Sequence, residues 1–216
     1  MRATVARVRV LLNCACSLDG KIAAPDGHPM PLSDDIDWRR VHLLRSNVDA
    51  ILVGVGTVAQ DDPSLLVKSD FAPVPKGKEP TRVVLDPKAR SPRTARVFDG
   101  KAPTIVVVAK GVRASFPNAV VVQAATDGGG HLDLNDVVRV LAEQGIRSVM
   151  VEGGGKVLRS FLQTDLVEAW TIYQAPVLIG GTGPSIFDGK PSMIGRRLHV
   201  ENVQPQGKGV LWTLRP

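Results

Sequence analysis

Short runs of β-branched and other apolar residues alternate along the chain with segments that have helical periodicity. The run 50–55 is continuously apolar, as expected for a strand buried on both faces of a sheet. Further runs predict strands at residues 8–13, 82–86, 104–108, 119–123, 147–152, 167–174 and 177–179. Two C-terminal runs, 198–203 and 210–214, could form an antiparallel edge. This alternation predicts an α/β fold with three layers, α/β/α, in which helices cover both faces of a mixed, mostly parallel central sheet.

Three segments between these runs have the signs of helices. The clearest carries apolar residues at positions i, i+3, i+4 and i+7, namely Leu134, Val137, Val138 and Leu141. An earlier helix is expected to begin at Ser33, because a hydroxyl can cap free N–H groups and the acidic residues that follow favour the positive helix end. A third, short helix is expected at residues 157–162.

Length and composition are those of an ordinary globular protein. The chain has 216 residues, 44% of them apolar and 22% charged, so we expect a single domain over residues 1–216. Cys14 and Cys16 lie in an apolar strand, where we expect them to be reduced and buried. The histidines have no partners at metal-ligand spacing, so we expect no metal site. The apolar stretch after the N-terminal arginines, 10–12, is too short for the core of a signal peptide, so we expect a cytoplasmic protein. The longest apolar stretch, 50–59, is too short to cross a bilayer.

The chain has a formal net charge of +6, which indicates an anionic ligand or a nucleic-acid surface without choosing between them. Basic residues gather in one segment, at Lys76, Lys78, Arg82, Lys88, Arg90, Arg93, Arg96 and Lys101. Aromatic residues make up only 4% of the chain, which leaves few rings to stack on single-stranded nucleic acid. The segment therefore favours a phosphate ligand or a solvated basic face, and an RNA-binding module is the remote alternative.

The sequence Glu152-Gly153-Gly154-Gly155 follows an apolar strand and precedes a helix. Glycines let the backbone approach a ligand closely, and free N–H groups at a helix N-terminus attract phosphate. The segment therefore predicts a cradle for a pyrophosphate, although a plain tight turn would use the same glycines. Leu158 stands at the third glycine position of the dinucleotide fingerprint, so the motif is a different one. Glu152 stands where α/β sheets bind ligands, and a solvated or capping acid is the alternative.

Two further clusters follow predicted strands. Residues 54–63 contain Thr57 and Asp61, which lie four apart and could face the same way if a helical turn begins at Thr57. Residues 17–23 contain Asp19-Gly20, which is as consistent with a simple hairpin turn as with a functional loop. Each cluster is weak evidence when it is taken alone.

Five segments nevertheless occur in a fixed order: Ser17-Leu-Asp-Gly-Lys21, Val41-His-Leu-Leu-Arg45, residues 54–65, Arg82-Val-Val-Leu-Asp86 and Glu152-Gly-Gly-Gly155. This series resembles the riboflavin-biosynthesis pyrimidine reductase family over nearly the whole chain, and most closely its stand-alone archaeal type. The resemblance implies a dihydrofolate-reductase-like fold, a homodimer, and NADPH-dependent reduction of the ribosylamino side chain of a pyrimidinone 5′-phosphate. Hydride would reach C1′ of the ring-opened imine and leave the ribitylamino form. The P-C-x-x-C deaminase motif of the bifunctional bacterial relatives is absent, so no deamination is expected.

The resemblance also assigns residues to the two ligands. For the cofactor it implies Thr57 and Asp61, and around the pyrophosphate it implies Gly153, Gly154, Gly155, Lys156 and Val157. For the substrate it implies Ser33, Arg45, Leu65 and Lys68. The bacterial pattern has arginine where this chain has Lys68, which leaves a cation for the 5′-phosphate but no bidentate fork.

Two pairs of charged residues are added on physical grounds. Lys21 and Glu152 belong to two strand ends, and a lysine and a carboxylate that approach each other tune each other's proton affinity, so we expect them to handle protons during ring opening. Lys88 and Arg90 follow a strand and could meet the 2′-phosphate of NADPH, although a surface role is equally consistent. The alternative function is reduction of another pterin or pyrimidine, such as the deaminated intermediate or dihydrofolate.

Overall fold

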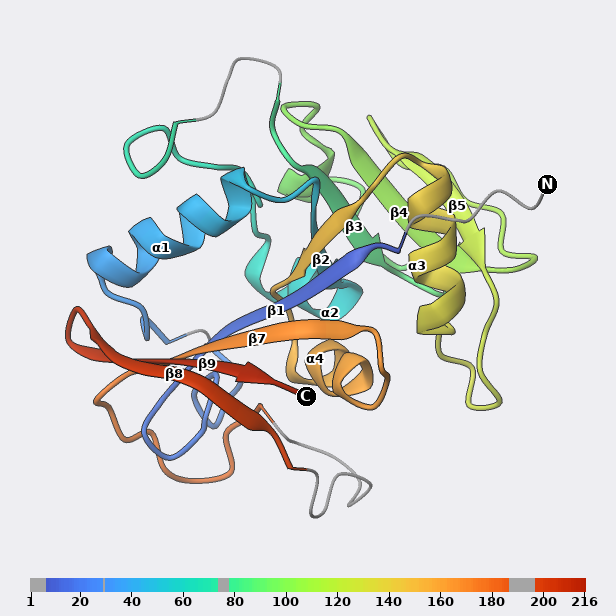
Figure 1. Ribbon diagram of the computed structural model, residues 1–216. Helices are drawn as coiled ribbons and strands as arrows, with labels where there is room; N and C mark the ends of the chain where they lie inside the picture. The colour runs from blue at the N-terminus through green and yellow to red at the C-terminus, as the bar shows by residue number, and fades with distance from the viewer. Residues whose placement is uncertain (1–6, 29, 74–77, 187–196) are drawn as a thin grey trace.

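The computed structural model describes residues 7–28, 30–73, 78–186 and 197–216, and it is built around one large sheet (Figure 1). Within these ranges the sheet has nine strands in the order β5-β4-β3-β2-β6-β1-β7-β9-β8. They are β1 (Arg9–Cys16), β2 (Ala50–Gly54), β3 (Thr81–Leu85), β4 (Thr104–Ala109), β5 (Val120–Ala124), β6 (Ser148–Val151), β7 (Val167–Gln174), β8 (His199–Gln206) and β9 (Gly209–Arg215). Neighbours from β5 to β7 pair in parallel, and β9 pairs antiparallel with β7 and β8. The predicted mixed, mostly parallel sheet and its antiparallel C-terminal edge are confirmed.

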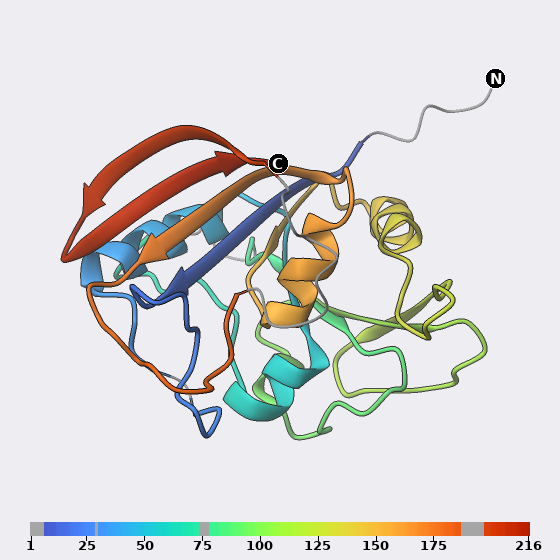
Figure 2. The same cartoon turned by 90° about the horizontal axis from the view of Figure 1, so that it is seen from below.

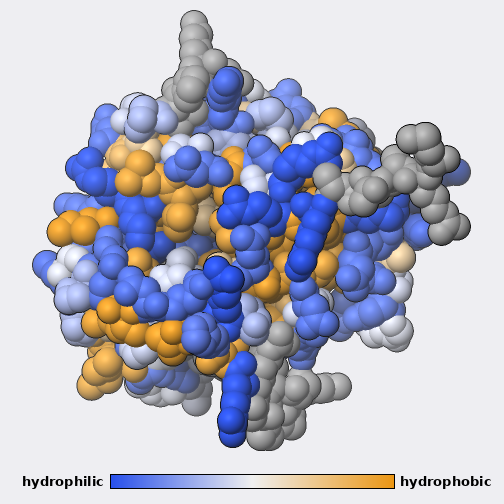
Figure 3. All heavy atoms as spheres, in the orientation of Figure 1, coloured by the Kyte–Doolittle hydropathy of each residue, from blue (hydrophilic) through white to orange (hydrophobic). Residues whose placement is uncertain are grey.

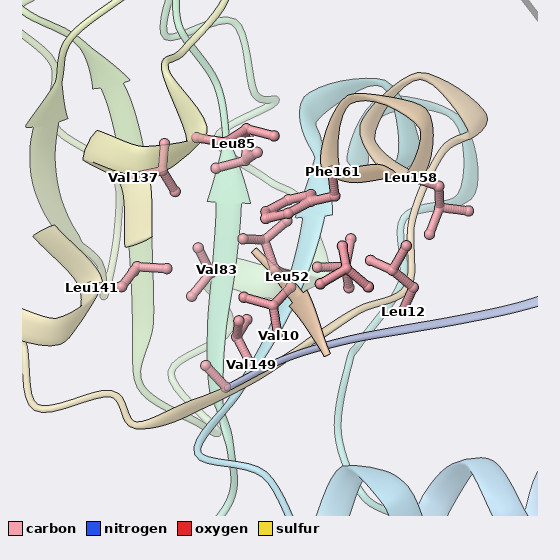
Figure 4. Packing of buried hydrophobic residues seen from close by; sticks show 14 of the residues in the cluster. Val10, Leu12, Leu52, Val83, Leu85, Val137, Leu141, Val149, Leu158 and Phe161 are labelled. Atoms are coloured by element: carbon pink, nitrogen blue, oxygen red, sulfur yellow. The ribbon is translucent and has the colours of Figure 1, made fainter. Parts of the chain in front are cut away.

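Helices cover both faces of this sheet. On one face α3 (Leu134–Glu143) and α4 (Gly155–Leu162) pack onto the central strands. Figure 4 shows this packing. Val137 and Leu141 of α3 and Leu158 and Phe161 of α4 face strand side chains such as Leu52 and Val83. The other side carries α1 (Asp35–Ser46), α2 (Val55–Asp61) and the short 3₁₀ helix η1 (Arg96–Phe98). Figure 2 shows α1 and α4 on opposite sides of the sheet, so the three-layer prediction is confirmed.

Residues 177–179, predicted as a strand, lie outside the sheet. The carbonyl of Val177 accepts a hydrogen bond from the backbone N–H of Leu18, and the carboxylate of Asp19 accepts from the N–H groups of Ile179 and Gly180. These partners in the loop after β1 replace the neighbouring strand that the prediction required. The same contacts, after the hydrogen bond from Ser17, lower the pKa of Asp19 to about 2. The prediction was therefore wrong, and this segment serves to fasten two loops together.

The helix α1 is capped by Asp34 and not by Ser33 as predicted. The Asp34 carboxylate accepts a hydrogen bond from the backbone N–H of Asp37 at 2.9 Å and another from that of Lys208 at 2.6 Å. The two oxygens of a carboxylate can accept one hydrogen bond from the helix and one from the tip of the β8–β9 hairpin, whereas a hydroxyl has a single, uncharged oxygen. The hydroxyl of Ser33 instead donates to the carboxylate of Asp37, at 2.5 Å.

Cys14 and Cys16 are free thiols, and both are buried, as predicted. Burial raises the pKa of the Cys14 thiol to about 12 and that of Cys16 to about 11, so both stay protonated at neutral pH. Among the described helices, none is long and apolar enough to cross a membrane.

The strand order brings distant parts of the chain to one edge of the sheet. β6 lies between β1 and β2, although it follows them by about a hundred residues in the sequence. The three strands are parallel, so the segments that follow them, beginning at Ser17, Val55 and Glu152, leave the sheet at the same edge. Ligands of open parallel sheets bind at this carboxyl edge.

Candidate functional site

The glycine turns after β2 and β6 hold the beginnings of α2 and α4 against each other. A Cβ atom on Gly54 would lie 2.7 Å from Cγ2 of Val157, and one on Gly153 would lie 2.8 Å from Cγ1 of Val53. The same atom on Gly153 would lie 3.0 Å from the hydroxyl oxygen of Thr57. Any larger residue at these two positions would force the neighbouring side chains to move. The structure thus brings Thr57, on α2, next to the glycine segment on which α4 begins.

The beginning of α4 presents free backbone N–H groups. Gly154 caps the helix with φ of +71°, a conformation that favours glycine, and no side chain within the described ranges caps the first turn. The N–H groups of residues 153–156 form no hydrogen bond with another described residue. Free N–H groups and the helix dipole together attract an anion at this point. The side chain of Lys156 is exposed in the same turn and adds a positive charge.

The carboxylate of Glu152 is held by Arg45, from the last turn of α1. Nε of Arg45 lies 2.8 Å from Oε1 of Glu152 and Nη2 lies 2.7 Å from Oε2, which is the bidentate geometry of a strong pair. Each side chain is only 10% exposed. Burial by itself would lower the pKa of Arg45, but the charge and hydrogen bonds of Glu152, together with the charge of Glu79, outweigh it and raise that pKa. The two residues therefore form one buried, charged unit.

Arg45, and not the expected Lys21, is the residue that the structure pairs with Glu152. Both oxygens of Glu152 are bonded by Arg45, and the ion pairs of the described residues include none between Lys21 and Glu152. Arg45 can bond this carboxylate because α1 lies on the sheet face toward which Glu152 projects. Lys21 instead pairs through its backbone with Ser185.

The loop that carries Lys21 nevertheless borders the glycine turn. The backbone N–H of Lys21 donates to the hydroxyl of Ser17 at 2.9 Å, and that of Gly20 donates to the carbonyl of Ser17, which closes the predicted turn. A Cβ on Gly155 would lie 2.7 Å from the carbonyl oxygen of Ser185. Residue 185 therefore joins the loop after β1 to the beginning of α4.

The loop after α2 carries two of the expected substrate residues. Leu65 is buried with φ of +52°, and Lys68 is exposed, with its ammonium 5.8 Å from the centre of the Phe71 ring. Arg45 donates from Nη1 to the carbonyl of Leu66 at 3.0 Å, so the loop is tied to the Arg45–Glu152 pair. Ser33 lies before the first residue of α1, whose 12 residues span about 18 Å, so α1 separates it from Arg45.

Desolvation raises the pKa of Asp61, the second expected cofactor residue on α2. It lies one turn after Thr57 on the same helix, which begins at Val55. The helix thus includes both residues and begins two positions before the turn considered at Thr57, and the two side chains stand at the i, i+4 spacing that gives a common helix face.

The basic segment is not one continuous charged surface. Arg82 is fully buried, and its guanidinium bonds Asp99 at 2.8 Å, the carbonyl of Ala102 at 2.7 Å and the hydroxyl of Thr104 at 3.0 Å. Arg82 therefore fastens the loop between β3 and β4 and cannot contribute to a ligand surface. Hydrophilic and hydrophobic side chains are interspersed over the face seen in Figure 3. Lys76 lies outside the described residues.

Lys88 and Arg90 are exposed in the loop after β3, on either side of Ala89 with φ of +54°. The buried carboxylate of Asp86 accepts hydrogen bonds at 2.7 Å from the N–H and the hydroxyl of Ser91, and so fixes this loop. Both cations are exposed, and neither forms an ion pair with another residue in the described part of the chain. Among the described residues no group of three or more His, Cys, Asp or Glu side chains is arranged to hold a metal ion.

Sequence reasoning missed His42 as a site residue. It is 1% exposed on α1, its Nδ1 lies 3.1 Å from the backbone nitrogen of Lys68, and its ring stacks on Phe71 with centroids 5.2 Å apart. The available signal was its position three residues before Arg45, which places both side chains on one face of a helix.

Comparisons with known proteins agree with this geometry. The 2,5-diamino-6-ribosylamino-4(3H)-pyrimidinone 5′-phosphate reductase of Archaeoglobus fulgidus is 36% identical, over 97% of this chain and 98% of the relative. A solved deaminase/5-amino-6-(5-phosphoribosylamino)uracil reductase of Thermotoga maritima is 31% identical with a TM-score of 0.80, over 97% of this chain and 57% of that one. Dihydrofolate reductase of Enterococcus faecalis, 10% identical, shares the fold with a TM-score of 0.53 over 96% of this chain and 95% of its own, so the predicted fold is confirmed. The model of the RibD C-terminal domain matches residues 8–212, and the chain therefore belongs to that family.

Proposed function

We propose that this protein reduces the ribosylamino side chain of a pyrimidinone 5′-phosphate to the ribitylamino form in riboflavin biosynthesis, with NADPH as reductant. The observation that carries the proposal is the junction of two helix N-termini at glycines after β2 and β6, beside the buried Arg45–Glu152 pair. The relative from Archaeoglobus fulgidus, which is named as this reductase, matches over nearly its whole length.

The glycine junction fits a dinucleotide. Cβ atoms at Gly153 and Gly155 would fill the space against Thr57 and Ser185. The N–H groups of residues 153–156 have no hydrogen-bond partner among the described residues and could therefore bond a pyrophosphate. When bound, NADPH supplies the hydride. The protein must then hold donor and acceptor in line and exclude water, which needs neither a nucleophile nor a metal. Thr57, Asp61, Lys156 and Val157 complete the proposed cofactor site.

The preference for NADPH over NADH is assigned to Lys88 and Arg90. Both are exposed after β3, in the loop that Asp86 holds in place. Two cations on an ordered loop can bond a 2′-phosphate, which NADH lacks. The cation of Lys68 is proposed to meet the 5′-phosphate of the substrate, with Leu65 on the same loop. Ser33, at the other end of α1, is proposed as a separate substrate contact.

The proton steps of ring opening are assigned to Lys21 and Glu152. Since Glu152 is paired with Arg45, the two act separately rather than as the mutually tuned pair that the sequence suggested. Each carboxylate oxygen keeps a second lone pair with which it can accept a hydrogen bond from the pyrimidine. Arg45 thereby orients a charged acceptor toward the substrate. We further infer that the protein acts as a homodimer in the cytoplasm, without a nucleic-acid or membrane partner.

The test is to follow the oxidation of NADPH by absorbance with three substrates in parallel. These are the diamino ribosylaminopyrimidine phosphate, its deaminated counterpart and dihydrofolate. We expect turnover of the diamino compound and none of dihydrofolate. The deaminated compound is the second candidate, because the Thermotoga maritima relative is named as a uracil reductase. If neither ribosylaminopyrimidine phosphate is reduced, the proposal is wrong.

A further inference from the structure

His42 lies between the helix that carries Arg45 and the loop that carries Lys68. Its side chain is buried, with 1% of the residue exposed, and its Nδ1 accepts the backbone N–H of Lys68 at 3.1 Å. The ring stacks on Phe71 with an interplanar angle of 14°. A histidine that only filled the core would need neither the acceptor nor this orientation.

Three successive residues of the loop are fastened, two of them by α1. The carbonyl of Leu66 accepts from Arg45 at 3.0 Å, and the N–H of Val67 donates to Glu79 at 3.1 Å. The N–H of Lys68 then donates to His42. Because Arg45 also holds Glu152, the helix α1 sets the position of the loop relative to the end of β6.

The imidazole can accept this hydrogen bond only while Nδ1 is unprotonated. Burial and, to a smaller extent, the positive charges of Arg45 and Lys68 together lower the pKa of His42 to about 4, against the smaller opposing effect of Glu152. The ring is therefore neutral at the pH of the cell, with its proton on Nε2.

We propose that His42 is a positioning residue for substrate binding: by accepting the backbone N–H of Lys68, it places the lysine ammonium where the 5′-phosphate of the substrate binds. The inference rests on the proposed function, since it takes Lys68 as the phosphate ligand. His42 touches neither the phosphate nor the reacting atoms. Its effect should therefore appear in the affinity for phosphorylated substrate and not in the chemical step.

Two amide variants separate the hydrogen bond from the volume of the side chain. His42→Asn places an acceptor oxygen near the position of Nδ1, whereas His42→Gln places it near Nε2, away from Lys68. A third variant, His42→Phe, keeps a ring that can stack on Phe71 but has no acceptor. Only His42→Asn should retain the contact.

The variants are compared by steady-state kinetics on the phosphorylated substrate and on the same compound without its phosphate. His42→Gln and His42→Phe should raise the KM for phosphorylated substrate roughly five- to tenfold, as expected for one lost buried hydrogen bond. The kcat and the KM for NADPH should stay at the wild-type level, and His42→Asn should behave like the wild type. On the dephosphorylated compound all four proteins should be alike. An equal loss on both compounds would show a merely structural role and overturn the inference.

Hydrogen exchange gives a second measurement, which does not require activity. The Lys68 amide should exchange faster in His42→Gln than in His42→Asn and in the wild type, and equal rates would overturn the inference. If the wild type reduces neither ribosylaminopyrimidine phosphate, the proposed function fails, and exchange still decides whether His42 holds the loop. If Lys68→Met leaves the KM for phosphorylated substrate unchanged, the phosphate is bound elsewhere and the inference fails with its premise.

Discussion

The Arg45–Glu152 pair allows a quantitative test by a double-mutant cycle. Arg45→Met leaves the Glu152 carboxylate and the carbonyl of Leu66 without their partner, and Glu152→Leu leaves a guanidinium without its counter-ion. The double variant removes both charges together. If the two residues form one buried unit, the single variants should each be costly and the double variant should cost much less than their sum.

The expected size follows from burial and geometry. Both side chains are 10% exposed, and they share two hydrogen bonds of 2.8 and 2.7 Å. Breaking a buried pair of this kind from one side costs about 3–5 kcal/mol, because an unpaired charge stays in a poorly solvated place. The residual exposure favours the lower end of that range. We therefore expect about 3 kcal/mol for each single variant and a coupling energy of about 2–3 kcal/mol.

The free energy of unfolding is measured in urea by circular dichroism, at neutral pH and at one protein concentration, because the stability of the proposed homodimer would depend on concentration. The exposed pair Arg9–Glu168, with side chains 62% and 45% exposed, is the matched control. Its cycle should give a coupling energy of at most about 1 kcal/mol. Additive effects of Arg45→Met and Glu152→Leu, within about 0.5 kcal/mol, would refute the view that the pair acts as a unit.

Three further predictions concern the cofactor site and pH. Gly153→Ala should weaken NADPH binding at least about tenfold, because its Cβ would lie 2.8 Å from Val53. Gly56→Ala is the control, since its Cβ would meet nothing within 4 Å. Equal curves for the two variants in a titration with NADPH would contradict the prediction. Reversing the charges of Lys88 and Arg90 should raise the KM for NADPH and spare that for NADH, and an unchanged cofactor preference would exclude their role. His42 has a folded-state pKa of about 4, below its ordinary 6.5, so the unfolded chain takes up the proton first and stability should fall as the pH drops from 6.5 toward 4. The stability lost between pH 7 and pH 5 through this residue should be about 2 kcal/mol. In His42→Asn the difference between the urea midpoints at pH 7 and pH 5 should be smaller by the corresponding amount.

The local patterns of the sequence were sufficient for most elements of the fold. The continuous run of β2, the i, i+3, i+4, i+7 spacing of α3 and the apolar surroundings of Cys14 each report burial of nearby residues, and burial is what forms those elements. The turn at Gly153–Gly155 was also visible, because only glycine allows such close approach and a φ of +71°. The ordered series of motifs, and not composition, indicated the family.

Partners distant in sequence were decided only by the tertiary structure. Glu152 bonds Arg45, 107 positions away, because β6 enters the sheet between β1 and β2, and no local pattern encodes that insertion. Arg82 was counted as a surface charge, yet it is buried and bonded by a loop that closes over it. Asp34 replaces Ser33 as the cap of α1 because the distant β8–β9 hairpin bonds to it as well. The sequence by itself determined which segments are buried and where the chain turns, since these depend on neighbouring residues. Which charged groups meet depended on the order of the strands, and therefore on the whole fold.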